Sequence, residues 1–148
     1  MVKRETVQVR FLGRDQIDVE FELEAQAIKE IKITAISGCS GFEQAARGLM
    51  AQINRDQSWP TVWTGADHAA ILLRELVLRA VGRFQLPYQE SELCHCRAVP
   101  TEVVDRAIIS GCHSIESVAR ITSAGTSCGT CKPDTEKLIA YRLNERLI

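Results

Sequence analysis

Two cysteine motifs, Cys94-His95-Cys96 and Cys128-Gly129-Thr130-Cys131, decide how the second half of this chain can fold. They hold four of the six cysteines, in the spacings C-x-C and C-x-x-C, and the segment between them is long enough for two short helices. Two thiolate pairs delivered from two loops suit a tetrahedral four-cysteine zinc site. They suit a four-thiolate iron–sulfur cluster equally well. Spacing alone therefore predicts a metal centre and leaves its identity open.

The residues around these motifs have helical periodicity. We expect one helix from an N-cap at Thr101 to a stop at Gly111, and a second from a cap at Ser114 to Thr122. A third begins near Pro133. The second should bury Ile115, Val118, Ala119 and Ile121, and the third should bury Leu138, Ile139, Leu143 and Leu147. The first two would form a hairpin that returns the chain and brings the cysteine motifs together, with backbone N–H groups around Gly125 and Gly129 turned toward the sulfurs.

Residues 93–140 resemble the [2Fe–2S]-binding domain shared by bacterioferritin-associated ferredoxins, the middle of NifU proteins and some nitrite reductases. The resemblance rests on both cysteine motifs, the two helices between them and the run Ala124–Cys131. It implies an all-α three-helix fold with a [2Fe–2S] cofactor whose iron is held by Cys94, Cys96, Cys128 and Cys131. A Rieske-type centre is excluded because it needs two histidine ligands, whereas His95 is a spacer and Cys128–Cys131 contains no histidine. Cys112, His68 and His113 are expected to lie outside this chemistry.

Composition narrows the class of protein further. The chain has 148 residues, a formal net charge of −1 and 25% charged residues, so nothing indicates a nucleic-acid-binding face. The most apolar run, Ala69–Val81, contains three charged residues and is too short to span a bilayer. Met1-Val2-Lys3-Arg4-Glu5 leads directly into a strand pattern, without an apolar signal region. We expect a cytoplasmic protein, in which paired cysteines indicate metal or redox chemistry more than structural disulfides.

The first part of the chain has the pattern of an α+β domain. Residues 6–12, 17–23 and 31–35 alternate apolar and polar side chains, which predicts three antiparallel strands packed on one face. Ser40-Gly41-Phe42-Glu43 has the form of a capping box, and the helix after it should end near Asn54. One side of this helix is apolar at helical spacing, with Phe42, Ala45, Ala46, Leu49, Met50 and Ile53. A second helix over 66–84 is apolar on most sides, which leaves a homodimer possible through it. With Leu86-Pro87-Tyr88 as linker, we expect an α+β domain over 1–88 and a helical domain over 89–148.

Cys39 is the thiol that could connect the first domain to the cluster. Residues 5–53 resemble the U-type iron–sulfur scaffold domain found in NifU and IscU: three strands, a Gly-Cys at the end of the third, then an amphipathic helix. The resemblance implies that Cys39 is a sulfur-accepting or transient cluster-binding thiolate, and a helix N-terminus favours the thiolate form. The scaffold's other two cysteines are missing, since none precedes Cys39 or lies between it and Cys94. A buried structural cysteine is the alternative.

The two resemblances together predict a NifU-like [2Fe–2S] protein of iron–sulfur cluster assembly, its cluster supplying or carrying electrons. Expected partners are a cysteine desulfurase, an apo iron–sulfur protein or a redox partner. One alternative is a small ferredoxin-like electron carrier whose first domain docks a partner. Another is a zinc-stapled interaction module. We do not expect an enzyme, because no nucleophile–base pair, phosphate loop or distinctive carboxylate pair is evident.

Overall fold

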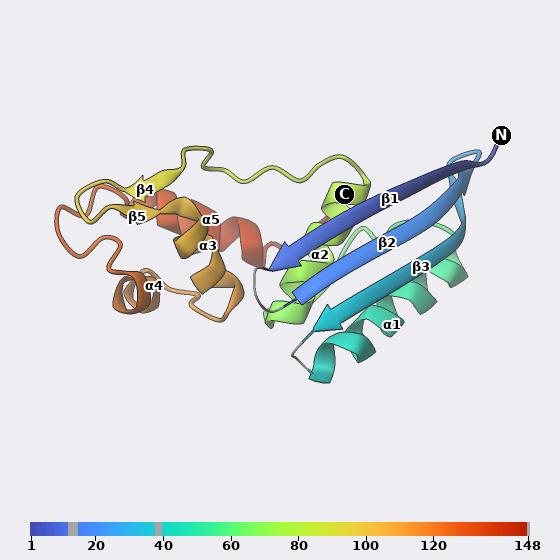
Figure 1. Ribbon diagram of the computed structural model, residues 1–148, viewed down its shortest axis with the longest axis horizontal. Helices are drawn as coiled ribbons and strands as arrows, with labels where there is room; N and C mark the ends of the chain where they lie inside the picture. Colours follow the sequence, from blue (N-terminus) through green and yellow to red (C-terminus); the bar gives the residue numbers. More distant parts are fainter. Residues whose placement is uncertain (12–14, 38–39, 148) are drawn as a thin grey trace. The chain divides into compact units, whose positions relative to one another are not determined.

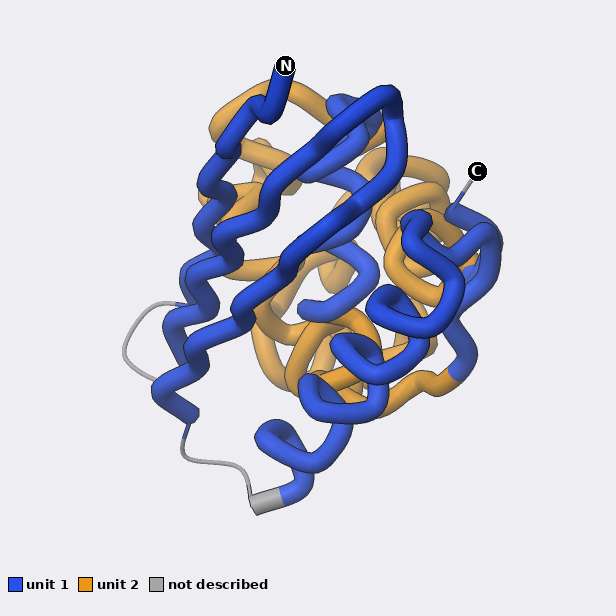
Figure 2. The backbone as a smooth tube through the Cα atoms, turned by 90° about the vertical axis from the view of Figure 1, so that its right-hand side faces the viewer, with its two compact units in different colours: residues 1–64, 72–84, 145–148 blue, residues 65–71, 85–144 orange. Residues whose placement is uncertain are grey.

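The computed structural model describes residues 1–11, 15–37 and 40–147. It divides into two compact units, shown in different colours in Figure 2. Unit 1 comprises residues 1–64, 72–84 and 145–148, and unit 2 comprises residues 65–71 and 85–144. A three-stranded sheet with two helices precedes a small helical region, which confirms the α+β class. The predicted domain boundary between residues 88 and 89 stays a prediction.

The sheet of unit 1 is an antiparallel meander in the order β1-β2-β3 (Figure 1). Its strands are β1 (Lys3–Phe11), β2 (Asp15–Glu24) and β3 (Ala27–Ser37), which confirms the three predicted alternations. Val19 pairs with Val7 on one side and Ile33 on the other. The alternation buries one face, including Val9, Ile17, Val19 and Phe21. Ala25 and Gln26, both with positive φ, make the tight turn between β2 and β3.

Helix α1 (Ser40–Asp56) packs against β3 in unit 1. Its buried side chains recur at helical spacing, as its sequence predicts: Phe42, Ala46, Leu49 and Ile53. The ring of Phe21 meets Trp59 edge-on, with centroids 4.9 Å apart. Cys39 and the side chain of Ser40 lie outside the described residues, so the predicted roles of both remain predictions.

Helix α2 (His68–Ala80) is shorter than the predicted 66–84. Asp67 explains its start, because Oδ1 of that residue accepts a hydrogen bond from the backbone N–H of Ala70 at 3.0 Å. Every residue from Ala69 to Val77 is buried. Two of these are charged and bonded: Arg74 donates to Trp63 O, and Glu75 pairs with Arg79 at 2.8 Å. Across the described residues, no helix combines the length and hydrophobicity needed to span a membrane.

Unit 2 contains three helices around one apolar core. They are α3 (Thr101–Ile109), α4 (Ile115–Thr122) and α5 (Lys132–Leu143), close to the three helices predicted. A short hairpin of β4 (Glu92–Cys94) and β5 (Val99–Pro100) precedes them, and the sequence pattern did not indicate it. The main core side chains are Leu93, Val99, Val104, Ile108, Val118, Leu138 and Ile139.

Three residues of unit 2 test the predicted helix caps and faces. Ser114 caps α4 as expected, in a reciprocal capping box with Ser117. Thr101 does not cap α3: Pro100 holds the N-cap position, and the buried Thr101 hydroxyl donates to Glu90 O at 2.6 Å. The predicted burial of Ile121 is wrong, since that side chain is 70% exposed. The period of an amphipathic helix identified the face of α4, but its last turn lies beyond the core.

The prediction for Leu147 is also wrong. Helix α5 ends at Leu143, so Leu147 is not part of its apolar face. The last residues belong to unit 1 instead. There Leu147 is buried, and its backbone N–H donates to Thr61 O at 2.8 Å. An apolar residue at helical spacing can therefore be buried by a different unit after the helix has ended.

Candidate metal centre

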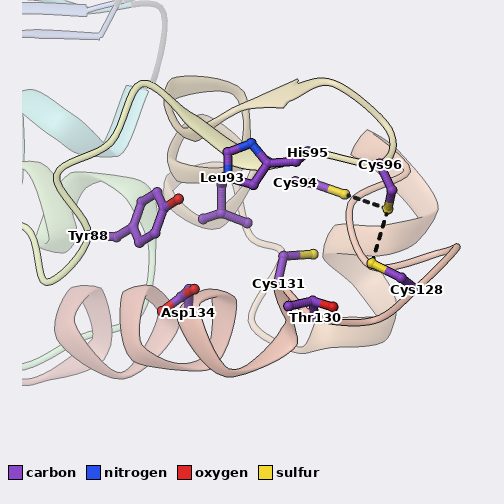
Figure 3. A pocket seen from close by; sticks show the side chains of 9 residues that line it. All are labelled: Tyr88, Leu93, Cys94, His95, Cys96, Cys128, Thr130, Cys131 and Asp134. Atoms are coloured by element: carbon purple, nitrogen blue, oxygen red, sulfur yellow. Dashed lines mark hydrogen bonds between the residues drawn. The ribbon is translucent and has the colours of Figure 1, made fainter.

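The four cysteines of the two motifs line one cavity in unit 2, of about 380 Å³. Cys94 ends β4 and Cys96 follows in the hairpin turn, whereas Cys128 lies in the loop after α4 and Cys131 directly precedes α5. Figure 3 shows their side chains converging from these two loops. The structure thus brings together all four residues that the sequence singled out. The other lining residues are Tyr88, Leu93, His95, Thr130 and Asp134.

The sulfur atoms are close enough to share an inorganic centre. Sγ of Cys94 lies 3.7 Å from Sγ of Cys96, which lies 3.4 Å from Sγ of Cys128. The thiol of Cys131 interacts with that of Cys94. All four are free thiols. Among the described residues, no group of three or more His, Cys, Asp or Glu side chains is arranged around a single-ion position.

Burial divides the four thiols into two classes. Cys94 and Cys131 are only 1% and 5% exposed, whereas Cys96 and Cys128 are exposed. Cys94 and Cys131 are both part of the apolar core of unit 2. The cavity therefore has one side set into the protein and one side at the surface.

The two buried thiols have opposite pKa shifts. Burial by itself would raise the pKa of Cys94, but hydrogen bonding from the backbone of Gly125 and Arg97, with further contributions from Cys131 and Cys96, lowers it below the ordinary thiol value. The pKa of Cys131 is raised to about 11, first by burial and then by its neighbour Cys94. Cys94 is thus easier to deprotonate than an ordinary thiol and Cys131 is harder, and binding of a metal centre would displace their protons.

The loop that carries Cys128 and Cys131 depends on two glycines. Gly125 and Gly129 have φ of +78° and +74°, a conformation that other residues adopt only with strain. The aliphatic stem of Lys132 lies over both of them. This conformation lets the Gly125 backbone reach Cys94 in the opposite motif, as the sequence predicted for this loop.

Several residues near the cavity were not identified from the sequence. Tyr88 was interpreted as part of a linker, yet its ring lines the cavity and its hydroxyl donates to Glu92 O at 2.8 Å. Asp134 reaches the cavity from the first turn of α5. His95 is exposed, with Nδ1 2.7 Å from Oε1 of Glu92. In the sequence, only its aromatic type and its position shortly before the first motif could have indicated that Tyr88 lines the cavity.

The remaining polar candidates lie apart from the cavity. Cys112 is partly buried and packs against the helical core, but it is not among the lining residues. Nε2 of His113 lies 3.1 Å from Ile108 O, which gives that ring a structural partner.

The chemistry of the cavity fits a four-thiolate cluster. Four cysteines are the usual ligands of a [2Fe–2S] centre, and backbone hydrogen bonds to their sulfurs are among the features that set its potential. Both are present, with the backbone of Gly125 and Arg97 directed at the most buried thiol. The cavity wall also supplies apolar and aromatic surface from Leu93 and Tyr88.

A comparison with known protein families identifies a match to part of unit 2. Residues 93–141 match the model of the BFD-like [2Fe-2S] binding domain, whereas a scaffold domain over residues 5–53 stays a prediction. No curated protein and no solved structure is significantly similar to the chain. The match begins one residue before Cys94 and ends within α5, so it contains both cysteine motifs. Residues 93–141 are thus similar to a BFD-like [2Fe–2S]-binding domain, and the cofactor of this protein is a [2Fe–2S] cluster.

Proposed function

We propose that Cys94, Cys96, Cys128 and Cys131 hold the cluster, and that the protein uses it to carry single electrons between partners. The observation that carries this proposal is the shared cavity, in which two thiols are buried and two are exposed. A cluster held there would have one edge close to the surface, where a redox partner can approach. The cluster supplies the one-electron chemistry; the chain's residues hold it, shield it and present it.

The buried and the exposed thiols would have different roles in binding the cluster and in electron transfer. Cys94 and Cys131, set in the apolar core, fix the position of the cluster and keep water from one side of it. Cys96 and Cys128 lie at the surface and form the short path to a partner. Backbone hydrogen bonding to Cys94 favours its thiolate form, which is the form that binds iron.

The spectrum of the purified protein tests this proposal. We expect a brown protein with [2Fe–2S] absorption and a reversible one-electron couple, and loss of the visible absorption in Cys96→Ser. Cys112→Ser is the matched control and should retain the colour, because Cys112 does not line the cavity. A colourless protein containing one zinc per chain would overturn the proposal in favour of a zinc-stapled interaction module.

A second candidate is a role in iron–sulfur cluster assembly, with the protein acting beside a cysteine desulfurase or an apo iron–sulfur protein. Its support is the order of elements in unit 1: an antiparallel meander, then an amphipathic helix, with Cys39 between Ser37 and Ser40 in the sequence. This order is the one that the scaffold resemblance implies. In this candidate Cys39 accepts sulfur, and the cluster of unit 2 supplies electrons.

A sulfur-transfer assay distinguishes the role in cluster assembly from the electron-carrier function. The apo protein would be incubated with a cysteine desulfurase and cysteine, and persulfide would be located by mass spectrometry. Assembly predicts persulfide on Cys39 and loss of that signal in Cys39→Ser, with Cys112→Ser unchanged. Absence of persulfide at Cys39, together with a working redox couple, would leave the electron-carrier function alone.

A further inference from the structure

Tyr88 closes the end of the cavity away from the exposed cysteines. In Figure 3 its ring lies on one side of the cavity, beyond Leu93, while Cys96 and Cys128 lie on the other. Tyr88 precedes the residues that match the family model, 93–141, so the match does not include it. It comes from the irregular segment that follows Phe84 and leads into β4, within unit 2.

Two interactions fix the position of this side chain. The ring packs against the apolar core of unit 2, as Leu86 also does. The hydroxyl donates a hydrogen bond of 2.8 Å to the carbonyl of Glu92, at the start of the strand that ends at Cys94.

We propose that Tyr88 is a positioning residue of the cluster site: its ring excludes water from the inner side of the cluster, and its hydroxyl holds the strand that carries Cys94. This inference rests on the proposed four-cysteine ligand set. It assigns a part of the site to residues that the sequence marked as a linker.

The expected effect on the reduction potential follows from charge. A cluster with four thiolate ligands is an anion, and reduction adds another negative charge. Water stabilises the more highly charged form more strongly, so exclusion of water disfavours reduction and keeps the potential low. If the Tyr88 ring is removed, solvent reaches the side of the cavity occupied by Cys94 and Cys131, and the potential should rise.

Three variants of Tyr88 separate the effect of the ring from that of the hydroxyl. Tyr88→Phe keeps the ring and loses the hydrogen bond to Glu92 O, whereas Tyr88→Leu and Tyr88→Ala remove the ring to increasing extents. Tyr141→Phe is the matched control, because Tyr141 is a tyrosine of the same unit whose hydroxyl accepts from Gln85 N at 3.0 Å and which does not line the cavity. Each holo variant is measured by spectroelectrochemistry, visible circular dichroism and the rate of cluster loss to an iron chelator.

The proposal predicts a graded result. Tyr88→Leu and Tyr88→Ala should raise the potential and speed cluster loss, by about tenfold in the alanine variant, the size of effect typical of residues that support metal ligands. Tyr88→Phe should keep the wild-type potential but lose the cluster faster, and Tyr141→Phe should match the wild type in both. If the alanine variant retains no cluster, the leucine variant decides.

Two outcomes overturn the inference. The first is a wild-type potential and wild-type release in Tyr88→Leu or Tyr88→Ala. The second is faster cluster loss in those variants without any change in potential, which describes a merely structural residue. Failure of the proposed ligand set is distinct from both, because it would show in the wild type as absent [2Fe–2S] absorption or in Cys96→Ser as a retained cluster.

Discussion

The Sγ atoms of Cys96 and Cys128 lie 3.4 Å apart although 32 positions separate them in the sequence. Helices α3 and α4 occupy that interval and pack on each other, which returns the chain to the β4–β5 hairpin. Both cysteines are exposed, so this pair forms the surface side of the cavity. The exposed side of the site is therefore built by long-range folding of unit 2, whereas Cys94 and Cys96 come from one short hairpin.

Substitution of single cysteines should separate ligands from the bystander. We expect Cys94→Ser, Cys96→Ser, Cys128→Ser and Cys131→Ser each to abolish or strongly alter the visible circular dichroism of the cluster. The buried variants Cys94→Ser and Cys131→Ser should also lower the stability of unit 2, because they replace core sulfur atoms with a polar group. A native spectrum in either Cys96→Ser or Cys128→Ser would contradict the ligand assignment, and Cys112→Ser serves as the control.

Removal of the cluster should destabilise unit 2 far more than unit 1. Metal binding contributes to the folding of small domains, and the cavity lies entirely within unit 2. Both tryptophans of the chain, Trp59 and Trp63, belong to unit 1, so their fluorescence reports that unit. We expect chelation of the iron to lower the midpoint of urea unfolding followed by far-UV circular dichroism, which reports the helices.

The fluorescence midpoint provides the internal control for that experiment. It should move little on chelation, because Trp59 packs on Phe21 in the core of unit 1. Equal shifts of both midpoints would show that the two units unfold as one, and would count against separate stabilisation by the cluster.

A buried ion pair joins α3 to α5, and its loss should be costly. Arg142 donates to both oxygens of Asp105, at 2.8 and 2.7 Å, and the two side chains are 5% and 13% exposed. Asp105→Asn removes the negative charge that Arg142 binds, which should reduce the free energy of unfolding of the holo protein by about 3 kcal/mol. Urea unfolding followed by circular dichroism measures it.

The exposed pair on the same helix supplies a matched control. Arg106 and Glu102 lie 3.3 Å apart in α3, with side chains 43% and 60% exposed. Water screens such a pair, so Glu102→Gln should cost only about 0.5 kcal/mol. Similar losses in Asp105→Asn and Glu102→Gln would contradict the importance given to burial.

The sequence predicts the regular parts of this protein well because their periodicity reflects a single local environment. Alternation located β1, β2 and β3, and the spacing of Phe42, Leu49 and Ile53 located the buried face of α1. The cysteine motifs indicated the cavity because two pairs of closely spaced thiols are typical of a metal or cluster site. Each of these signals is contained in a window of a few residues.

The parts that sequence reasoning missed depend on contacts between distant segments. Tyr88 follows Pro87 and has the local pattern of a linker, and only the folded unit shows its ring at the cavity. Thr101 has the residue type of an N-cap, but the carbonyl of Glu90 competes for its hydroxyl. Ile121 has the correct helical phase, yet nothing in the described residues buries it. In each case a tertiary neighbour, or its absence, overrides the local preference.

The end of the chain gives the last prediction. Residues 145–147 pair with 61–63: Trp63 N donates to Glu145 O at 2.9 Å, Arg146 bridges Val62, and Leu147 N donates to Thr61 O. Leu147 is 4% exposed, so Leu147→Ala removes buried apolar surface from unit 1 and should cost about 2 kcal/mol or more. Urea unfolding followed by tryptophan fluorescence measures the loss, since Trp63 lies in the segment that pairs with residues 145–147.

Arg146→Ala is the control for the effect of any substitution near the end of the chain. Arg146 is exposed, and its replacement keeps the backbone pairing with Val62, so it should cost no more than about 0.5 kcal/mol. The visible spectrum of the cluster should be unchanged in both variants, because Leu147 belongs to unit 1 and the cavity to unit 2. A loss of stability in Leu147→Ala that appears in the helical signal but not in the fluorescence would contradict the contribution of Leu147 to unit 1.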